Sequence, residues 1–104
     1  MSDTALYLNL TDAEQAKRLI GEKVQLAFKG NKTVRMILVR ERSRLVAGAT
    51  MRNPRMSESE VEQIAGMRNV EEEVLRLIGM RRDWTSKYPI ALALIKNPKA
   101  PIGV

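Results

Sequence analysis

Apolar residues recur at three- and four-residue spacings over most of the chain, with polar residues between them. This spacing is the period of an α-helix with one buried face. The longest such stretch starts with Thr11-Asp12-Ala13-Glu14, which is a capping box, and ends at Gly30-Asn31, which is typical of a helix stop. The pattern therefore predicts a helix over residues 11–30, which Gly21 could bend or break.

Beyond this helix the pattern predicts shorter helices separated by polar breaks. Asn53-Pro54 and Asn97-Pro98 each end a helix, because proline pushes the preceding residue out of the helical region and donates no hydrogen bond. Ser57-Glu58-Ser59-Glu60 repeats the capping box, and Asn69 and Asp83 are residues that favour N-caps. We expect helices over residues 33–39, 43–51, 58–67, 70–80 and 89–95, with a helical turn at 84–87.

The breaks recur with internal similarity. Residues 46–55 match residues 90–99, with identical Ala, Ala, Asn and Pro and with basic residues in corresponding places. Gly66-Met67-Arg68-Asn69 and Gly79-Met80-Arg81-Arg82 form a second pair. Short helices that recur cannot each bury an apolar face alone, so they stack against one another. The sequence predicts an all-α fold, a short right-handed α-solenoid forming one domain over residues 1–104. Within it, 1–10 is an N-terminal arm, 11–30 a capping helix and 31–104 the repeats.

Two segments, residues 34–40 and 90–101, resemble the leucine-rich repeat variant. The segment 53–65, in which a Ser-capped helix follows Asn53-Pro54, adds to the resemblance. This family is an all-helical relative of HEAT and armadillo repeats. The likeness covers about residues 33–104 and departs from the family pattern at 40–43 and 82–84, where Asn-Pro is absent. The resemblance implies stacked helices and no particular activity.

Composition excludes several kinds of chemistry. The 104 residues include no histidine and no cysteine, which removes imidazole bases, thiolate nucleophiles, disulfides and the usual zinc sites. Gly30-Asn31-Lys32-Thr33 lacks the Gly-Lys-Thr succession of a phosphate loop, and the clusters Glu71–Glu73 and Glu58, Glu60 and Glu62 fall in first turns of predicted helices, where carboxylates are favoured. We expect no catalytic residue, no cofactor and no metal. With only 4% aromatic residues, the core must be aliphatic.

The beginning of the chain has no positive charge ahead of its short apolar stretch, so it does not resemble a signal peptide. No apolar run approaches the roughly 18 residues of a membrane span. The sequence therefore predicts a cytoplasmic protein with no membrane partner.

Charge is segregated along the chain. The net charge is +6, and residues 29–55 hold eight basic residues against the single acidic Glu41, followed by a mainly acidic block over 56–78. Helix dipoles alone favour such alternation, but a basic surface also attracts phosphates or acidic partners. Trp84 packs with Tyr88 or, if exposed, marks an interaction hot spot. The candidate macromolecule-binding residues are Lys32, Arg35, Arg40, Arg42, Arg44, Arg52, Arg55 and Trp84.

These observations favour a non-enzymatic α-helical repeat module that mediates protein–protein interaction, as a scaffold or adaptor. The alternative is a nucleic-acid-binding protein that uses the basic surface of residues 29–55. The chain ends shortly after Pro101, where a further repeat helix would begin. A solenoid normally ends in a polar capping repeat. We therefore expect that the chain is a piece of a longer protein or that another copy covers the apolar end near Ile95 and Ile102 in a homodimer.

Overall fold

The structure is a computed structural model, and it describes residues 11–101. Within this range every regular element is an α-helix, so the all-α prediction is confirmed. The helices are α2 (Asp12–Lys29), α3 (Lys32–Leu38), α4 (Arg44–Met51), α5 (Glu58–Ala65), α6 (Glu72–Met80), α7 (Arg82–Thr85) and α8 (Tyr88–Lys96). The predicted arm over residues 1–10 lies outside the described residues.

Side-chain caps start the first four of these helices. The hydroxyl of Thr11 accepts a hydrogen bond from the backbone N–H of Glu14 (3.2 Å), and that of Ser57 accepts from the N–H of Glu60 (3.3 Å). Asn31 and Ser43 cap α3 and α4 in the same way. Because these bonds satisfy amides that have no partner within the helix, the capping residues fix where each helix begins. The N-caps predicted at Thr11 and Ser57 are confirmed, and each hydroxyl also donates to the carboxylate of the same glutamate (2.9 Å to Glu14 and 3.3 Å to Glu60).

The helix predicted over residues 11–30 is confirmed as α2, which passes through Gly21 without a break. Two predicted N-caps are wrong. The helix α6 begins after Glu71 rather than after Asn69, because Val70 between them is buried in the core and the chain turns inward there before the helix starts. The helix α7 begins after Arg81, so Asp83 lies in its first turn rather than at its N-cap.

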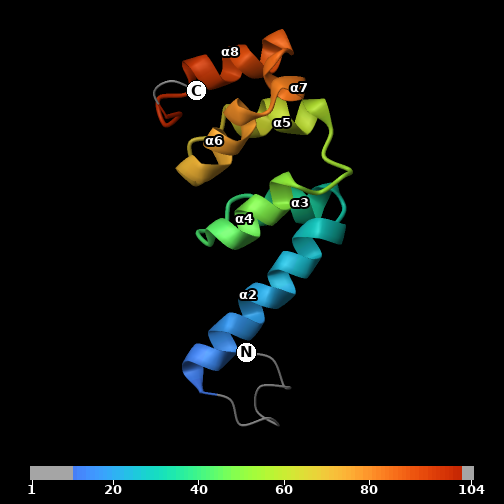
Figure 1. Ribbon diagram of the computed structural model, residues 1–104, viewed down its shortest axis with the longest axis vertical. Coiled ribbons are helices and arrows are strands. Elements are labelled where there is room, and N and C mark those ends of the chain that lie inside the picture. The colour runs from blue at the N-terminus through green and yellow to red at the C-terminus, as the bar shows by residue number, and fades with distance from the viewer. Residues whose placement is uncertain (1–10, 102–104) are drawn as a thin grey trace.

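The helices are arranged as successive layers along an elongated molecule of 51 × 25 × 18 Å. Figure 1 shows α2 at one end, α3 beside α4 in the middle, α5 beside α6 above them, and α7 with α8 at the far end. The helix α4 packs against both α2 and α6, and α8 packs against α5. Each layer is therefore supported by the next.

The core falls into two clusters of buried side chains. The larger one joins α3 and α4 to α5, α6, α7 and α8, and it is mainly aliphatic, with Val39, Met51, Ile64, Ile78 and Ile90 at its centre. The smaller one lies under α2 and contains Ala27, Leu38, Val46 and Ala49. The predicted aliphatic core is confirmed, with Trp84 as its one aromatic member among the described residues. The α2 end of the molecule is thus the less thickly packed part.

Asn53 ties the end of α4 to the end of α2. Its side-chain amide donates to the carbonyl oxygens of Ala27 (2.9 Å) and Gly30 (3.1 Å), and its side-chain oxygen accepts from the N–H of Arg55 (2.9 Å). The side chain is buried, so these bonds satisfy groups that would otherwise be costly to bury.

Asn97 ties the end of α8 to the end of α5 in the same manner. Its amide donates to the carbonyl oxygens of Ala65 (2.8 Å) and Met67 (2.7 Å), and its oxygen accepts from the N–H of Lys99 (2.9 Å). The two Asn-Pro phrases that match in sequence therefore make matching hydrogen bonds. In this correspondence α4 is equivalent to α8, and α2 is equivalent to α5, with Ala27 in the place of Ala65.

Candidate functional site

Arg35 is a structural residue. Its side chain is 5% exposed. Its Nε donates to Oε2 of Glu60 (2.8 Å), its Nη2 donates to Oε1 of Glu60 (2.6 Å), and its Nη1 donates to the carbonyl of Gly30 (2.9 Å). Because Arg35 is buried and its guanidinium is held by a bidentate pair, the residue is not available on the surface to bind a partner. Its inclusion among the predicted macromolecule-binding residues is corrected by this burial.

The same pair shifts both titrations. The hydrogen bonds from Arg35 hold the pKa of Glu60 below its ordinary value against the opposing effect of burial. The hydrogen bond to Glu60 in turn raises the pKa of Arg35. Glu60 is thus ionised at neutral pH, and its carboxylate on α5 binds the guanidinium of Arg35 on α3. The pair joins α3 to α5 across the middle of the molecule.

Trp84 is also buried. It is 5% exposed within the larger core cluster, and the guanidinium carbon of Arg81 lies 3.7 Å from the centroid of its ring. The alternative that the sequence left open, packing in the core, therefore holds, and Trp84 is not available as an exposed hot spot. Tyr88, in contrast, begins α8 and is largely exposed.

The other six predicted residues are all exposed. Arg40, Arg42 and Arg44 lie at the start of α4, whereas Arg52 and Arg55 lie beyond its end. Lys32 joins the second group, since Asn53 is bonded to Gly30 just ahead of α3. Arg44 and Arg52, from the two ends of α4, both act on the carboxylate of Glu73.

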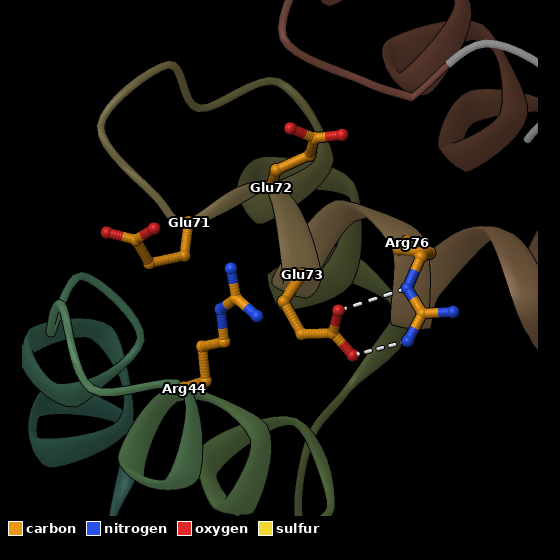
Figure 2. A pocket seen from close by; sticks show the side chains of 5 residues that line it. All are labelled: Arg44, Glu71, Glu72, Glu73 and Arg76. Atoms are coloured by element: carbon orange, nitrogen blue, oxygen red, sulfur yellow. Dashed lines mark hydrogen bonds and ion pairs between the residues drawn. The ribbon is translucent and has the colours of Figure 1, made fainter.

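A charged pocket of about 320 Å³ lies between the start of α4 and the start of α6. It is lined by Arg44, Glu71, Glu72, Glu73 and Arg76. Figure 2 shows the guanidinium of Arg44 pointing between Glu71 and Glu73, and Glu73 paired with Arg76 (2.7 Å). The hydrogen bond from Arg76 lowers the pKa of Glu73, with smaller contributions from Arg44 and Arg52. The lining thus holds three carboxylates against two guanidiniums, and Glu73 is an anion rather than a proton donor.

In residues 11–101 no group of three acidic side chains comes close enough together to hold a metal ion, and this includes Glu71–Glu73. Glu72 and Glu73 lie in the first turn of α6, as the sequence predicted. Their position is the one that the helix dipole favours.

A more apolar groove, which we call the first groove, lies between α2 and α4. It has a volume of about 530 Å³ and is lined by Lys17, Ile20, Gly21, Val24, Gln25, Phe28, Leu45, Ala49 and Arg52. Leu45 is 69% exposed and Phe28 is 41% exposed. Large apolar side chains left open in a concave surface are typical of a binding site.

Sequence reasoning identified only Arg52 in the first groove. The apolar residues of α2 recur with helical spacing, and this periodicity assigned them to the core. Only Ala27 of α2 is in fact buried, because α4 covers one side of the helix and leaves the adjacent side open. The signal that could have indicated the groove was an apolar residue, Leu45, directly after Arg44 in a basic segment.

A second groove, of about 360 Å³, occupies the equivalent place between α5 and α8. When Ala27 is matched to Ala65, the first-groove residues Ile20, Gly21 and Val24 correspond to Glu58, Ser59 and Glu62. When Asn53 is matched to Asn97, Leu45 corresponds to Pro89. The second groove is thus built on the same framework but is acidic where the first is apolar. Lys87 also lines it and pairs with Glu58 (3.7 Å).

None of the helices in the described part of the chain is long and apolar enough to cross a membrane. Ile95, at the end predicted to form a homodimer, is exposed, whereas Ile102 lies outside the described residues. Comparison with protein-family models, with curated proteins and with solved structures found no match to this chain. The resemblance to the leucine-rich repeat variant therefore stays a prediction.

Proposed function

We propose that this chain is a cytoplasmic α-helical repeat module that binds another protein through the first groove. The observation that carries the proposal is the open apolar lining of that groove, with Leu45 and Phe28 exposed in a concavity. A surface of this kind gains free energy when a partner removes it from water, at roughly 25 cal/mol for each Å² of apolar area.

The matched bonds of Asn53 and Asn97 support the repeat interpretation. Two segments with related sequences that anchor equivalent helix ends are what a solenoid of the leucine-rich repeat variant or HEAT kind would contain. Such modules use the surface of their stack for binding, which fits the location of the first groove on the outside of α2 and α4.

The nucleic-acid alternative has weaker support. Binding to phosphates needs several uncompensated cations on one surface, and the exposed Arg44 and Arg52 both lie in the field of the Glu73 carboxylate. Arg35 is occupied by Glu60, and Trp84 is unavailable for stacking on a base.

Site-specific photocrosslinking in the cells that express the protein tests the proposal. A p-benzoylphenylalanine at Leu45 should capture a discrete protein, and the same group at Met80, which is equally exposed but lies outside the first groove, should not. Capture of the same protein from both positions, or of none from Leu45, would contradict the proposed site. Salt-dependent binding of RNA or DNA by the purified chain, lost in the variant Arg52→Ala/Arg55→Ala, would support the alternative instead.

A further inference from the structure

We infer that the first groove takes an amphipathic α-helix whose apolar face is flanked by carboxylates. This inference rests on the proposed function and adds the chemistry of the partner. A helix that lays its apolar face into a hydrophobic groove is a common mode of recognition, and three features of the first groove favour it over an uncharged or basic segment.

The first feature is the shape of the groove. Its α2 wall extends from Lys17 to Phe28, a length of about 16 Å at 1.5 Å for each helical residue, which corresponds to about three turns of a bound helix. Gly21 lies in the middle of this wall, and a Cβ built there would meet no atom within 4 Å. The missing side chain leaves room for the backbone of a partner to approach α2 closely.

The second feature is the charge of the rim. Lys17 and Arg52 are the charged residues that line the first groove, and both are positive and exposed. Neither takes part in an ion pair within the described residues. Arg52 acts on Glu73 only through its field, without a hydrogen bond. A partner helix with carboxylates beside its apolar face would complement both cations.

The third feature is the contrast with the second groove. There Glu58 and Glu62 replace the apolar Ile20 and Val24, and Lys87 already pairs with Glu58. The same framework would repel an acidic helix at that place. Specificity for an acidic partner is therefore a property of the first groove and not of the fold as a whole.

Fluorescence anisotropy with two designed peptides tests the inference on the full chain. Both are labelled helices of about 16 residues with Leu at helical spacing, and the flanks carry Glu in one and Lys in the other. We expect the Glu peptide to bind at least about tenfold more tightly than the Lys peptide, with a preference that weakens as salt is raised. Equal binding of the two peptides, or tighter binding of the Lys peptide, overturns the inference.

Matched variants locate the binding. Gly21→Phe should fill the groove and abolish binding of the Glu peptide, and Gly21→Ala, which adds one methyl group where the partner backbone approaches, should weaken binding by a smaller factor. Lys17→Glu/Arg52→Glu should reverse the preference between the two peptides. Arg55→Glu changes an exposed charge outside the groove and serves as the control. Binding that survives Gly21→Phe, or that falls as much in Arg55→Glu as in Lys17→Glu/Arg52→Glu, overturns the inference.

The peptide result and the proposed function can fail separately. If Leu45→p-benzoylphenylalanine captures a protein in cells but neither peptide binds, the groove is a protein-binding site and only the acidic-helix inference fails. If no protein is crosslinked in cells and neither peptide binds, both the inference and the proposed function fail. Crosslinking of the purified chain at Leu45 to its own residues 1–10, or to a second copy, would show a different occupant and overturn the inference.

Discussion

The two corners of the molecule that are held by Asn53 and Asn97 share a framework and differ in what surrounds it. Both asparagines bond two carbonyls at the end of an earlier helix, and Ala27 and Ala65 are both fully buried beside them. One residue earlier the corners diverge, since Leu26 is 54% exposed whereas its equivalent Ile64 is completely buried.

The difference arises because the α5–α8 corner has a layer on each side of α5. The layer of α3 and α4 contributes Val39 and Met51 to the cluster that contains Ile64. The helix α2 has no such cover in the described part of the chain, and its packing rests on the small cluster beneath it. The buried asparagine anchor thus forms in the same way whether or not the outer face of the helix is covered. The α2 corner is accordingly the one that exposes apolar surface on the helix.

The largest effect is expected at the ion pair between Arg35 and Glu60, which links the two corners. Replacement of Arg35 by Met leaves the carboxylate of Glu60 buried without its partner, which should lower the free energy of unfolding by about 3–5 kcal/mol in urea denaturation. The double variant Arg35→Met/Glu60→Leu removes both charges and should recover a large part of this loss. A double variant as unstable as Arg35→Met would contradict the idea that the unpaired carboxylate causes it.

The ion pair also predicts a pH dependence. The pKa of Glu60 is lower in the folded chain than in the unfolded chain, because Arg35 donates hydrogen bonds to its carboxylate. The contribution of this group to stability is therefore complete above the ordinary pKa of a glutamate and is lost as the pH falls through the lowered value. Thermal unfolding at a series of acidic pH values should show a steeper loss of stability in the original chain than in Arg35→Met/Glu60→Leu. Parallel curves would contradict the prediction.

The next test truncates the equivalent residues at the two corners. Ile64→Ala removes atoms from the centre of the larger cluster and should cost about 2–5 kcal/mol of unfolding free energy. Leu26→Ala, at the equivalent place on α2, should change it by less than about 0.5 kcal/mol because the side chain is already half in water. A large loss in Leu26→Ala would show that α2 is covered in solution, for example by residues outside the described range or by a second copy.

A smaller effect is expected at the asparagines themselves. Asn53→Ala and Asn97→Ala each remove three hydrogen bonds and take the side-chain donor from the carbonyl of Ala27 or Ala65, which should cost about 1–3 kcal/mol at either corner. The Gly30 carbonyl keeps its hydrogen bond from Arg35. The substitution to Asp should not rescue the stability, because a carboxylate accepts but does not donate. Nearly equal losses at the two positions would support the repeat interpretation, and a loss at only one of them would contradict it.

Much of this fold follows from local chemistry that can be read along the chain. Thr11 and Ser57 cap their helices because a hydroxyl three residues ahead of a backbone N–H can accept from it, whatever the rest of the chain does. The Asn-Pro phrases end helices for reasons that are equally local. The similarity of residues 46–55 to 90–99 has a counterpart in the structure, where Asn53 and Asn97 make matching hydrogen bonds.

The candidate site depended on contacts between distant segments and could not be predicted in this way. Arg35 looked like its exposed neighbours in the sequence, and only the approach of Glu60, from a different helix, makes it a buried partner. The residues of the first groove have the same periodicity as core residues. Whether Ile20 and Val24 are covered depends on which helix lies against α2, and a single helix does not carry that information.

The last prediction concerns glycine in α2, and it tests the openness of the first groove directly. Gly21→Ala should raise the free energy of unfolding by about 0.5–1 kcal/mol, because alanine favours the helix and its methyl group enters empty space.

Gly30→Ala, at the C-terminal end of the same helix, should have the opposite effect. A Cβ there would lie 2.5 Å from Cγ1 of Val34 and 2.7 Å from the backbone oxygen of Leu26, and the backbone oxygen cannot move aside without distorting the end of α2. Urea denaturation of the two variants compares these signs. If Gly21→Ala were also destabilising, the space above Gly21 would be filled in solution, and the α2 corner would be covered like the α5 corner rather than open to a partner.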